Sequence, residues 1–139
     1  MSVDHRDCDE ALTRFEDAVR DGGVEAFRKA FQAFREAMLR HFAREEDALF
    51  PAFEAATGNT QGPTAVMRME HQQMRMVLEQ LADDVARDDR AACLGRTDTL
   101  MLLAQQHNMK EEQILYPMCD QVCADAAALL ERLRAPDAD

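Results

Sequence analysis

The sequence is poor in the residues that interrupt helices. Of its 139 residues only five are glycine and four are proline, and these gather in short clusters between long periodic segments. Runs of β-branched residues are scarce as well, while Ala, Leu, Glu, Arg and Met, which favour helices, are plentiful. This composition predicts an all-helical protein.

Basic residues are also in short supply, with 16 Lys and Arg against 27 Asp and Glu and a net charge of -11. No basic stripe interrupts this negative charge, which speaks against a nucleic acid or an anionic membrane as partner. No stretch approaches the roughly 18 apolar residues of a membrane-spanning helix, and residues 1–7 carry charges where a signal peptide needs an apolar run. We therefore expect a cytoplasmic protein.

The four cysteines form no recognisable framework. Their positions match neither a zinc ribbon nor a set of disulfides, so in the cytoplasm they are expected to be reduced thiols. Cys8 falls one helical turn after His5, where it either fills space in the core or touches a metal pocket. Cys119 and Cys123 are either filling residues or a redox-active pair.

The chain has four histidines, and they mark an internal repeat. His41 begins the stretch H-F-A-R-E-E-D-A-L-F-P, and His107 begins the similar stretch H-N-M-K-E-E-Q-I-L-Y-P. The two stretches share the pattern H-x3-E-E-x2-L-[F/Y]-P and lie 66 residues apart, the same distance that separates His5 from His71. The sequence therefore consists of two halves that each contain H-x35-H-x3-E-E.

Apolar residues recur every three or four positions in four long segments, which predicts two helical hairpins. The expected helices cover residues 4–20, 24–57, 64–87 and 91–117, followed by a short fifth helix over 125–134. Pro51 is expected to kink or end the second helix, because proline removes a backbone donor and clashes with a preceding carbonyl. The prediction is an all-α, up-down four-helix bundle with an internal two-fold pseudo-repeat, a single domain over 1–134 and a disordered tail over 135–139.

A histidine and the glutamate four residues after it share one face of a helix. This applies to both repeats, and in each helix the apolar stripe runs through the histidine. Burying such groups is costly unless they are paired or bind a metal, so they point to a metal site in the bundle core. With the histidine ahead of each pair, the candidate ligands are His5, His41, Glu45, His71, His107 and Glu111.

Several neighbours of the candidate ligands are expected to be structural. Glu46 and Glu112 lie about 100° further round their helices than the glutamates before them, which places them at the boundary or surface. Phe50 and Tyr116 are expected to pack at helix ends beside the prolines that follow, and Ile114 belongs to the core stripe of its helix. The methionines expected to fill gaps in the core are Met67, Met69, Met74, Met76, Met101, Met109 and Met118.

The donor set contains nitrogen and oxygen without thiolate, which favours Fe, Mn or Zn over Cu(I) or an iron–sulfur cluster. Glu and His on facing helices of a bundle suit a carboxylate-bridged metal pair. If Glu45 and Glu111 both bridge, then they, the four histidines and an oxo or hydroxo bridge fill all but one position on each of two octahedral metals. Each metal then keeps one open position.

These residues resemble the ligand pattern of the hemerythrin-like family of HHE cation-binding domains, over residues 4–118. The resemblance implies a non-haem di-iron centre in a four-helix bundle, with two Fe ions held by the six candidate ligands. Oxygen-carrying hemerythrins have a fifth histidine where this chain has Arg75, and an aspartate where it has Glu112. The first difference speaks against reversible oxygen carriage, and the second leaves open whether Glu111 or Glu112 bridges the metals.

The resemblance also implies a protein that binds or reacts with O2, NO or peroxide, as a sensor or stress-response protein. One alternative is an iron donor for damaged centres, because the ligand set is similar to that of proteins that repair iron centres after nitrosative stress. The other is an enzyme that consumes peroxide or NO. No general acid or base other than the ligands is evident, which speaks against an organic substrate. A protein partner is compatible with all three functions, and no sequence pattern specifies an oligomer.

Overall fold

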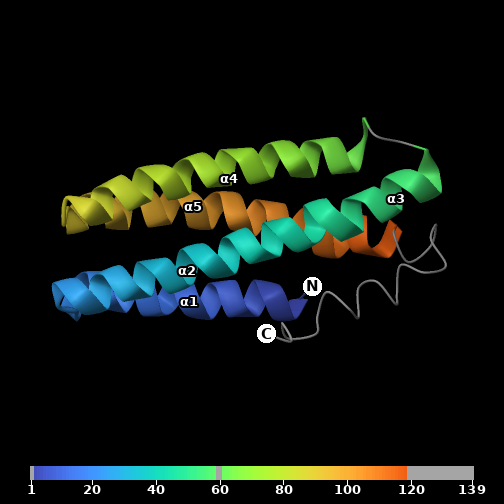
Figure 1. Ribbon diagram of the computed structural model, residues 1–139. Coiled ribbons are helices and arrows are strands. Elements are labelled where there is room, and N and C mark those ends of the chain that lie inside the picture. Colours follow the sequence, from blue (N-terminus) through green and yellow to red (C-terminus); the bar gives the residue numbers. More distant parts are fainter. Residues whose placement is uncertain (1, 59–60, 119–139) are drawn as a thin grey trace.

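The computed structural model describes residues 2–58 and 61–118, which form a bundle of antiparallel helices (Figure 1). Two hairpins lie side by side, α1 with α2 and α4 with α5, and each hairpin comes from one of the two repeats. The bounds are α1 Ser2–Asp21, α2 Val24–Arg44, η1 Glu45–Leu49, α3 Phe50–Thr57, α4 Pro63–Ala86, α5 Arg90–Lys110 and η2 Glu111–Leu115. The predicted all-α four-helix bundle is confirmed.

The turns between helices occur where the sequence supplies glycine, proline or a capping side chain. α3 ends at Gly58, whose φ of 69° lies in the left-handed region that glycine adopts without strain. α4 begins with Pro63, whose missing N–H has no intrahelical partner to lose in the first turn. α5 begins after Asp89, whose side chain accepts a hydrogen bond from the backbone N–H of Ala92 at 3.1 Å.

The core between the first two helices is aromatic. Phe15 of α1 packs against three phenylalanines of α2, with ring centroids 5.7, 5.9 and 6.1 Å apart: Phe31, Phe27 and Phe34. All four rings are at most 2% exposed. Burial of each contributes about 1.5–3 kcal/mol to folding. This packing fixes the register of the helices, and with it the level at which side chains further along the bundle meet.

Both helices that carry the H-x3-E-E pattern widen by one π-helical turn, η1 or η2. In η1 the backbone N–H of Phe50 donates to the carbonyl of Glu45, and in η2 the N–H of Tyr116 donates to that of Glu111. Pro51 follows η1 and has no N–H to donate, so a widened turn precedes it in place of a regular one. Of the two predicted outcomes, an end at Pro51 is wrong, because the helix continues through α3.

The π-helical turns change which residues face the core. Ile114, predicted to lie in the core stripe, is 53% exposed, whereas Leu115 is 1% exposed. A π-helix has more residues per turn than an α-helix, so each residue turns through a smaller angle and the inward position moves one residue along the chain. The prediction for Ile114 is therefore wrong.

The methionines lie only partly in the core. Met67 and Met74 are at most 4% exposed and fill gaps as predicted. Met69, Met76 and Met109 are more than half exposed, because they lie two residues from an inward position and therefore on the outer side of α4 or α5. The prediction of core filling is wrong for these three residues.

No helix in the described part of the chain is long and apolar enough to cross a membrane. The predicted fifth helix over 125–134, the tail over 135–139, Cys119 and Cys123 lie outside the described residues. Cys8 and Cys93 are both buried. Burial raises the pKa of the Cys93 thiol to about 11, which keeps that thiol protonated at neutral pH.

Candidate metal centre

Six buried side chains from all four long helices of the bundle meet near the start of α1. They are the six predicted ligands, and none is more than 6% exposed: His5, His41, Glu45, His71, His107 and Glu111. Two overlapping groups have candidate ligand atoms within 4.8 Å of one another, Glu45 with His71, His107 and Glu111, and His5 with His41 and Glu111. The structure therefore brings together all six candidate ligands.

The contacts at this site cross between the two halves, so that a histidine of one half meets the glutamate of the other. His5 Nε2 lies 2.9 Å from Glu111 Oε1, and His71 Nε2 lies 2.9 Å from Glu45 Oε1. His41 Nε2 lies between the carboxylates, 3.4 Å from Glu45 Oε1 and 3.6 Å from Glu111 Oε1. The site is complete only when both hairpins have packed together.

The histidines form two close pairs, one from each hairpin. The ring centroids of His5 and His41 are 4.8 Å apart, and those of His71 and His107 are 4.7 Å apart. His107 Nε2 also lies 3.1 Å from His71 Nε2 and 3.1 Å from Glu111 Oε2. The Nε2 atoms of both pairs thus point into one shared space with the two carboxylates.

Two further carboxylates hold the outer nitrogens of the second histidine pair. Glu46 Oε2 lies 2.6 Å from His71 Nδ1, and Arg75 donates to both oxygens of Glu46 at 2.8 and 2.9 Å. Glu70 Oε1 lies 2.9 Å from His107 Nδ1. A carboxylate on Nδ1 orients the ring so that Nε2 faces the centre, and it makes Nε2 a stronger donor to a metal.

The sequence-based prediction placed Glu46 and Glu112 at the boundary or surface and missed these contacts. The side chain of Glu46 is 19% exposed and yet bonded to His71. Glu112 is 43% exposed, and its Oε1 lies 3.3 Å from His5 Nδ1. The sequence did contain a pattern that could have indicated carboxylates behind the histidines. The Glu-Glu doublet recurs in both repeats, and an acidic residue precedes both His5 and His71.

The electrostatics of the cluster keep His107 protonated and Glu111 ionised. Burial disfavours a charged His107, but its interactions with the Glu111 and Glu45 carboxylates outweigh this and raise its pKa to about 10. Burial likewise disfavours a charged Glu111, yet its interactions with Glu45 and with the histidines hold its pKa well below the usual range. A metal cation would replace the proton and neutralise the carboxylates in its place.

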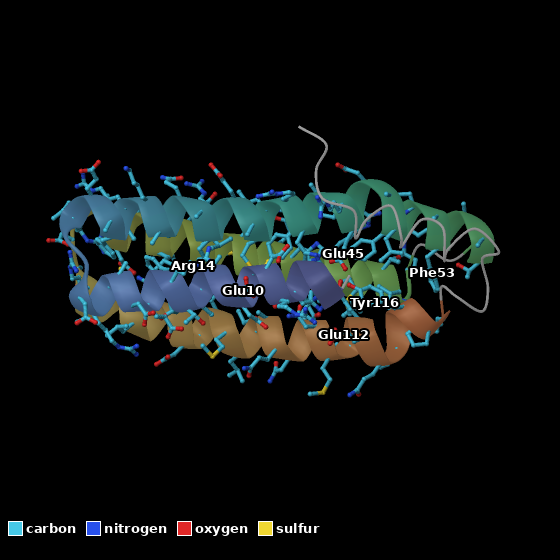
Figure 2. The ribbon with its side chains drawn as sticks, turned by 90° about the horizontal axis from the view of Figure 1, so that it is seen from below. Glu10, Arg14, Glu45, Phe53, Glu112 and Tyr116 are labelled. Atoms are coloured by element: carbon cyan, nitrogen blue, oxygen red, sulfur yellow. The ribbon has the colours of Figure 1, made fainter. Side chains whose placement is uncertain are left out.

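Tyr116 contributes a hydroxyl group to the site and lies close to Glu45 (Figure 2). The hydroxyl donates a hydrogen bond of 2.8 Å to Glu45 Oε2, and the residue is 8% exposed. Burial and the neighbouring carboxylates raise the pKa of Tyr116 far above its usual value, so the phenol stays protonated. Helix-end packing was predicted for Tyr116, and the contact with a candidate ligand was missed because the π-helical turn brings the ring inward.

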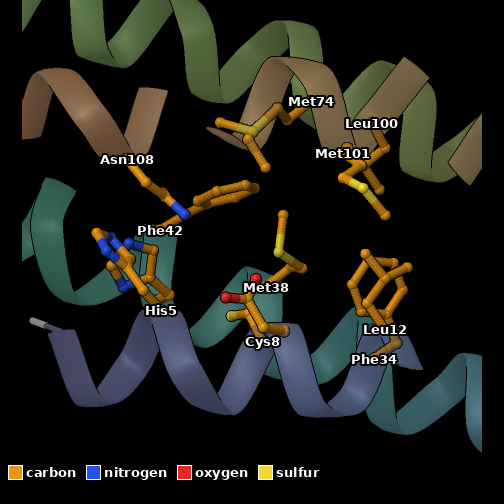
Figure 3. Close-up of a pocket in the computed structure, with 13 residues that line it drawn as sticks. His5, Cys8, Leu12, Phe34, Met38, Phe42, Met74, Leu100, Met101 and Asn108 are labelled. Carbon is orange, nitrogen blue, oxygen red and sulfur yellow. The ribbon is translucent and has the colours of Figure 1, made fainter. Parts of the chain in front are cut away.

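A cavity of about 20 Å³ adjoins the site beside His5 (Figure 3). That volume is enough for about one water-sized or diatomic molecule. Four side chains in its wall carry sulfur: Cys8, Met38, Met74 and Met101. An open groove on the outside shares five residues with the cavity wall, which therefore separate the cavity from solvent: His5, Asp9, Leu12, Met101 and Asn108.

Phenylalanine rings cover His71, the residue that corresponds to His5 in the second repeat. Phe42 and Phe50 both stack on His71, with centroids 4.4 and 5.5 Å from its ring. The residue that corresponds to Phe42 in the second repeat is Asn108, which lines the cavity beside His5. The two histidine pairs therefore have different surroundings although their sequence motifs match.

The donor set fits a metal site. Four imidazoles and two carboxylates are buried together, and Glu111 Oε2 is buried without a hydrogen bond from the described residues. Nitrogen and oxygen donors without thiolate suit iron, manganese or zinc. Cys8 lines the cavity but belongs to neither group of candidate ligand atoms, so both predicted roles, core filling and contact with the pocket, describe its position.

Comparison with known proteins agrees with this geometry. The family model of the hemerythrin HHE cation binding domain matches residues 1–119. Neither a search of curated proteins nor a search of solved structures gave a match. The family match covers most of the chain and includes every candidate ligand, and it agrees with the helical bundle and the buried cluster of histidine and glutamate. The chain belongs to the hemerythrin family of HHE cation-binding domains.

Proposed function

We propose that this chain is a non-haem di-iron protein that binds or reacts with O2, NO or peroxide, as a sensor or stress-response protein. The observation that supports it is the meeting of two histidine pairs around two carboxylates, beside a cavity of about 20 Å³. The polar cluster would hold the metals. The cavity has the size of the proposed ligands.

Each histidine pair would hold one iron, and the two glutamates Glu45 and Glu111 would be shared between the irons. Glu111 is a better bridging ligand than Glu112, because Glu111 lies among the inward-facing nitrogens of three histidines. Glu112 instead lies beside the outer nitrogen of His5. We therefore assign Glu112 a supporting position behind a ligand.

Iron bound here would supply open coordination positions and a change of oxidation state. The protein supplies the surroundings of those positions. Glu46 and Glu70 orient two histidine ligands from behind, and the mostly apolar wall of the cavity favours a small, weakly polar molecule over bulk water. The ring of Phe42 covers His71, so the small ligand would bind on the His5 side.

One observation supports the alternative of an enzyme that consumes peroxide or NO. Tyr116 places a protonated hydroxyl against a candidate ligand, which the sequence alone did not reveal. The structure gives less support to an iron donor, because all six donors are at most 6% exposed and the bundle would have to open to release iron.

Elemental analysis tests the metal content directly. Protein produced with adequate iron is expected to hold two iron atoms per chain, since the donors form two histidine pairs with two carboxylates between them. Saturation at one metal, or no metal, would contradict the di-iron proposal. Two bound zinc ions would preserve the geometry and remove the redox function.

Stopped-flow spectroscopy of the reduced, iron-loaded protein tests the small-molecule function. The chain has four histidines and no fifth one to fill the last position on one of the irons, so both irons would keep an open position. We therefore expect NO to bind, and air to oxidise the protein without a stable oxygenated form. Release of O2 under vacuum would favour oxygen storage instead. Repeated turnover of peroxide or NO with an electron donor would favour the enzyme, and rapid transfer of iron to an apo cluster protein would favour repair.

A further inference from the structure

The two candidate bridging carboxylates are held differently. Glu45 Oε2 accepts a hydrogen bond from the hydroxyl of Tyr116 at 2.8 Å. Glu111 Oε2 is buried, lies 3.1 Å from His107 Nε2 and has no contact with hydrogen-bond geometry in the described residues. The difference follows from one substitution between the repeats, since the residue that corresponds to Tyr116 in the first repeat is Phe50.

Phe50 and Tyr116 occupy comparable places in the two halves. The ring of Tyr116 stacks on His5 at 6.2 Å with an interplanar angle of 26°, and the ring of Phe50 stacks on His71 at 5.5 Å with an angle of 27°. Both residues follow a π-helical turn and both are buried. A hydroxyl on Phe50 would therefore point toward Glu111, as that of Tyr116 points toward Glu45.

We propose that Tyr116 is a positioning residue that anchors Glu45, which leaves Glu111 as the carboxylate that shifts when a small ligand binds on the His5 side. This inference rests on the proposed di-iron function. With metals bound, the histidine Nε2 atoms would serve as ligands and would no longer bond to the carboxylates. The phenol hydroxyl is not needed as a ligand and keeps its 2.8 Å hydrogen bond to Glu45 Oε2. It therefore restrains Glu45 more strongly than Glu111, with which it interacts more weakly.

The position of Glu111 agrees with this role. Its Oε1 lies 2.9 Å from His5 Nε2, and His5 lines the cavity in which the ligand would bind. Movement of Glu111 would therefore make room for a ligand between His5 and the cavity. Glu45 Oε1 lies 2.9 Å from His71 Nε2, on the side that Phe42 covers, where an anchored carboxylate does not obstruct the ligand.

The test compares Tyr116→Phe, Phe50→Tyr and the double variant in which the two residues are exchanged. Mössbauer spectra of the di-ferric protein report whether the two irons differ, and stopped-flow mixing with azide, a small anionic probe, reports how fast a ligand enters. Iron content and thermal unfolding are measured for each variant, so that loss of the site or of the fold is recognised.

We expect two distinct quadrupole doublets for the unaltered protein and doublets that converge in Tyr116→Phe, because neither carboxylate is then anchored. Phe50→Tyr should slow azide binding about tenfold or more, as expected for a new hydrogen bond to a charged oxygen. The exchanged variant should show the slow binding and regain two distinct doublets.

Unchanged spectra in Tyr116→Phe, or unchanged azide binding in a folded Phe50→Tyr with two irons, would overturn the inference and leave the di-iron proposal intact. Absence of iron from the unaltered protein would overturn both.

Discussion

The two adjacent glutamates of the first repeat have different tasks. Glu45 faces the histidines with Oε1 and accepts the hydrogen bond of Tyr116 with Oε2, whereas Glu46 bonds to the outer nitrogen of His71 and to Arg75. The sequence identified Glu45 because it shares a helix face with His41. It did not identify the role of Glu46, because the partner of Glu46 comes from the other half of the chain and the intervening turn is widened.

Removal of Glu46 should weaken metal binding without removing a ligand. We expect Glu46→Ala to lower the affinity for iron or zinc by about 10- to 100-fold, the usual effect of losing a partner behind a histidine ligand. Glu112→Ala is the matched control and should have a smaller effect, because Glu112 is 43% exposed and its Oε1 lies 3.3 Å from His5. Competition with a metal chelator measures both affinities. Equal effects of the two substitutions would contradict the asymmetry of the site.

Asn108 should control how easily a small molecule reaches the His5 side. Asn108 corresponds to Phe42 of the first repeat, so Asn108→Phe gives both repeats a phenylalanine at this position. The new ring should fill the cavity of about 20 Å³. We expect NO binding to the reduced protein to slow by about tenfold or more, as an overpacking cost of about 1–3 kcal/mol implies, with iron content unchanged. Asn108→Ser is the control and should bind NO at least as fast as the unaltered protein. Rapid binding to Asn108→Phe would place the ligand elsewhere.

Among the elements, the long helices could be predicted from the sequence and the π-helical turns could not. The three- and four-residue spacing of apolar residues predicts a helix and its buried face, as for Phe27, Phe31 and Phe34 of α2. A proline inside such a pattern is compatible with a kink, an end or a widened turn, and local sequence does not decide among them. The inward position of Leu115 follows from the widened turn, which is why Ile114 was predicted in its place.

The register after η2 can be tested by a pair of neighbouring substitutions. Leu115→Ala should lower the free energy of unfolding by about 2–5 kcal/mol, because it leaves a cavity in the core. Ile114→Ala should change it by less than about 0.5 kcal/mol, because Ile114 is 53% exposed. Urea unfolding of the two variants measures the difference. A larger loss for Ile114→Ala would mean that the helix keeps regular α-helical register past Glu111.

At the scale of the whole molecule, the sequence predicts the two-fold repeat but not the differences between its halves. The spacing of 66 residues relates His5 to His71, His41 to His107 and Glu45 to Glu111, and the structure brings all six residues into one cluster. The repeats also differ at three places that the structure brings to the site, each named with its counterpart: Phe42 and Asn108, Phe50 and Tyr116, and Asp9 and Arg75. These differences are visible in the sequence, but only the packing of the two hairpins shows that they surround the candidate ligands.

The assembled site also makes the stability of the metal-free protein depend on pH. The pKa of His107 is raised from 6.5 to about 10, because its interactions with the Glu111 and Glu45 carboxylates outweigh the cost of burial. Below pH 6.5 His107 carries its proton in both the folded and the unfolded chain, and the stabilisation is fully present. Between pH 6.5 and about 10 only the folded chain keeps the proton, so stability should fall as the pH rises through this window.

Urea unfolding of the metal-free protein at several pH values between 6 and 10 would measure this dependence. Metal affinity should change in the opposite direction, because a metal must displace the proton of His107 and competes better as the pH rises. The control is His107→Gln, which keeps a polar side chain at this position but has no proton to lose in this range. It should remove this part of the slope on the alkaline side. If the unaltered protein and His107→Gln show the same pH dependence, the proton does not reside on His107, and another group of the polar cluster carries it in the metal-free protein.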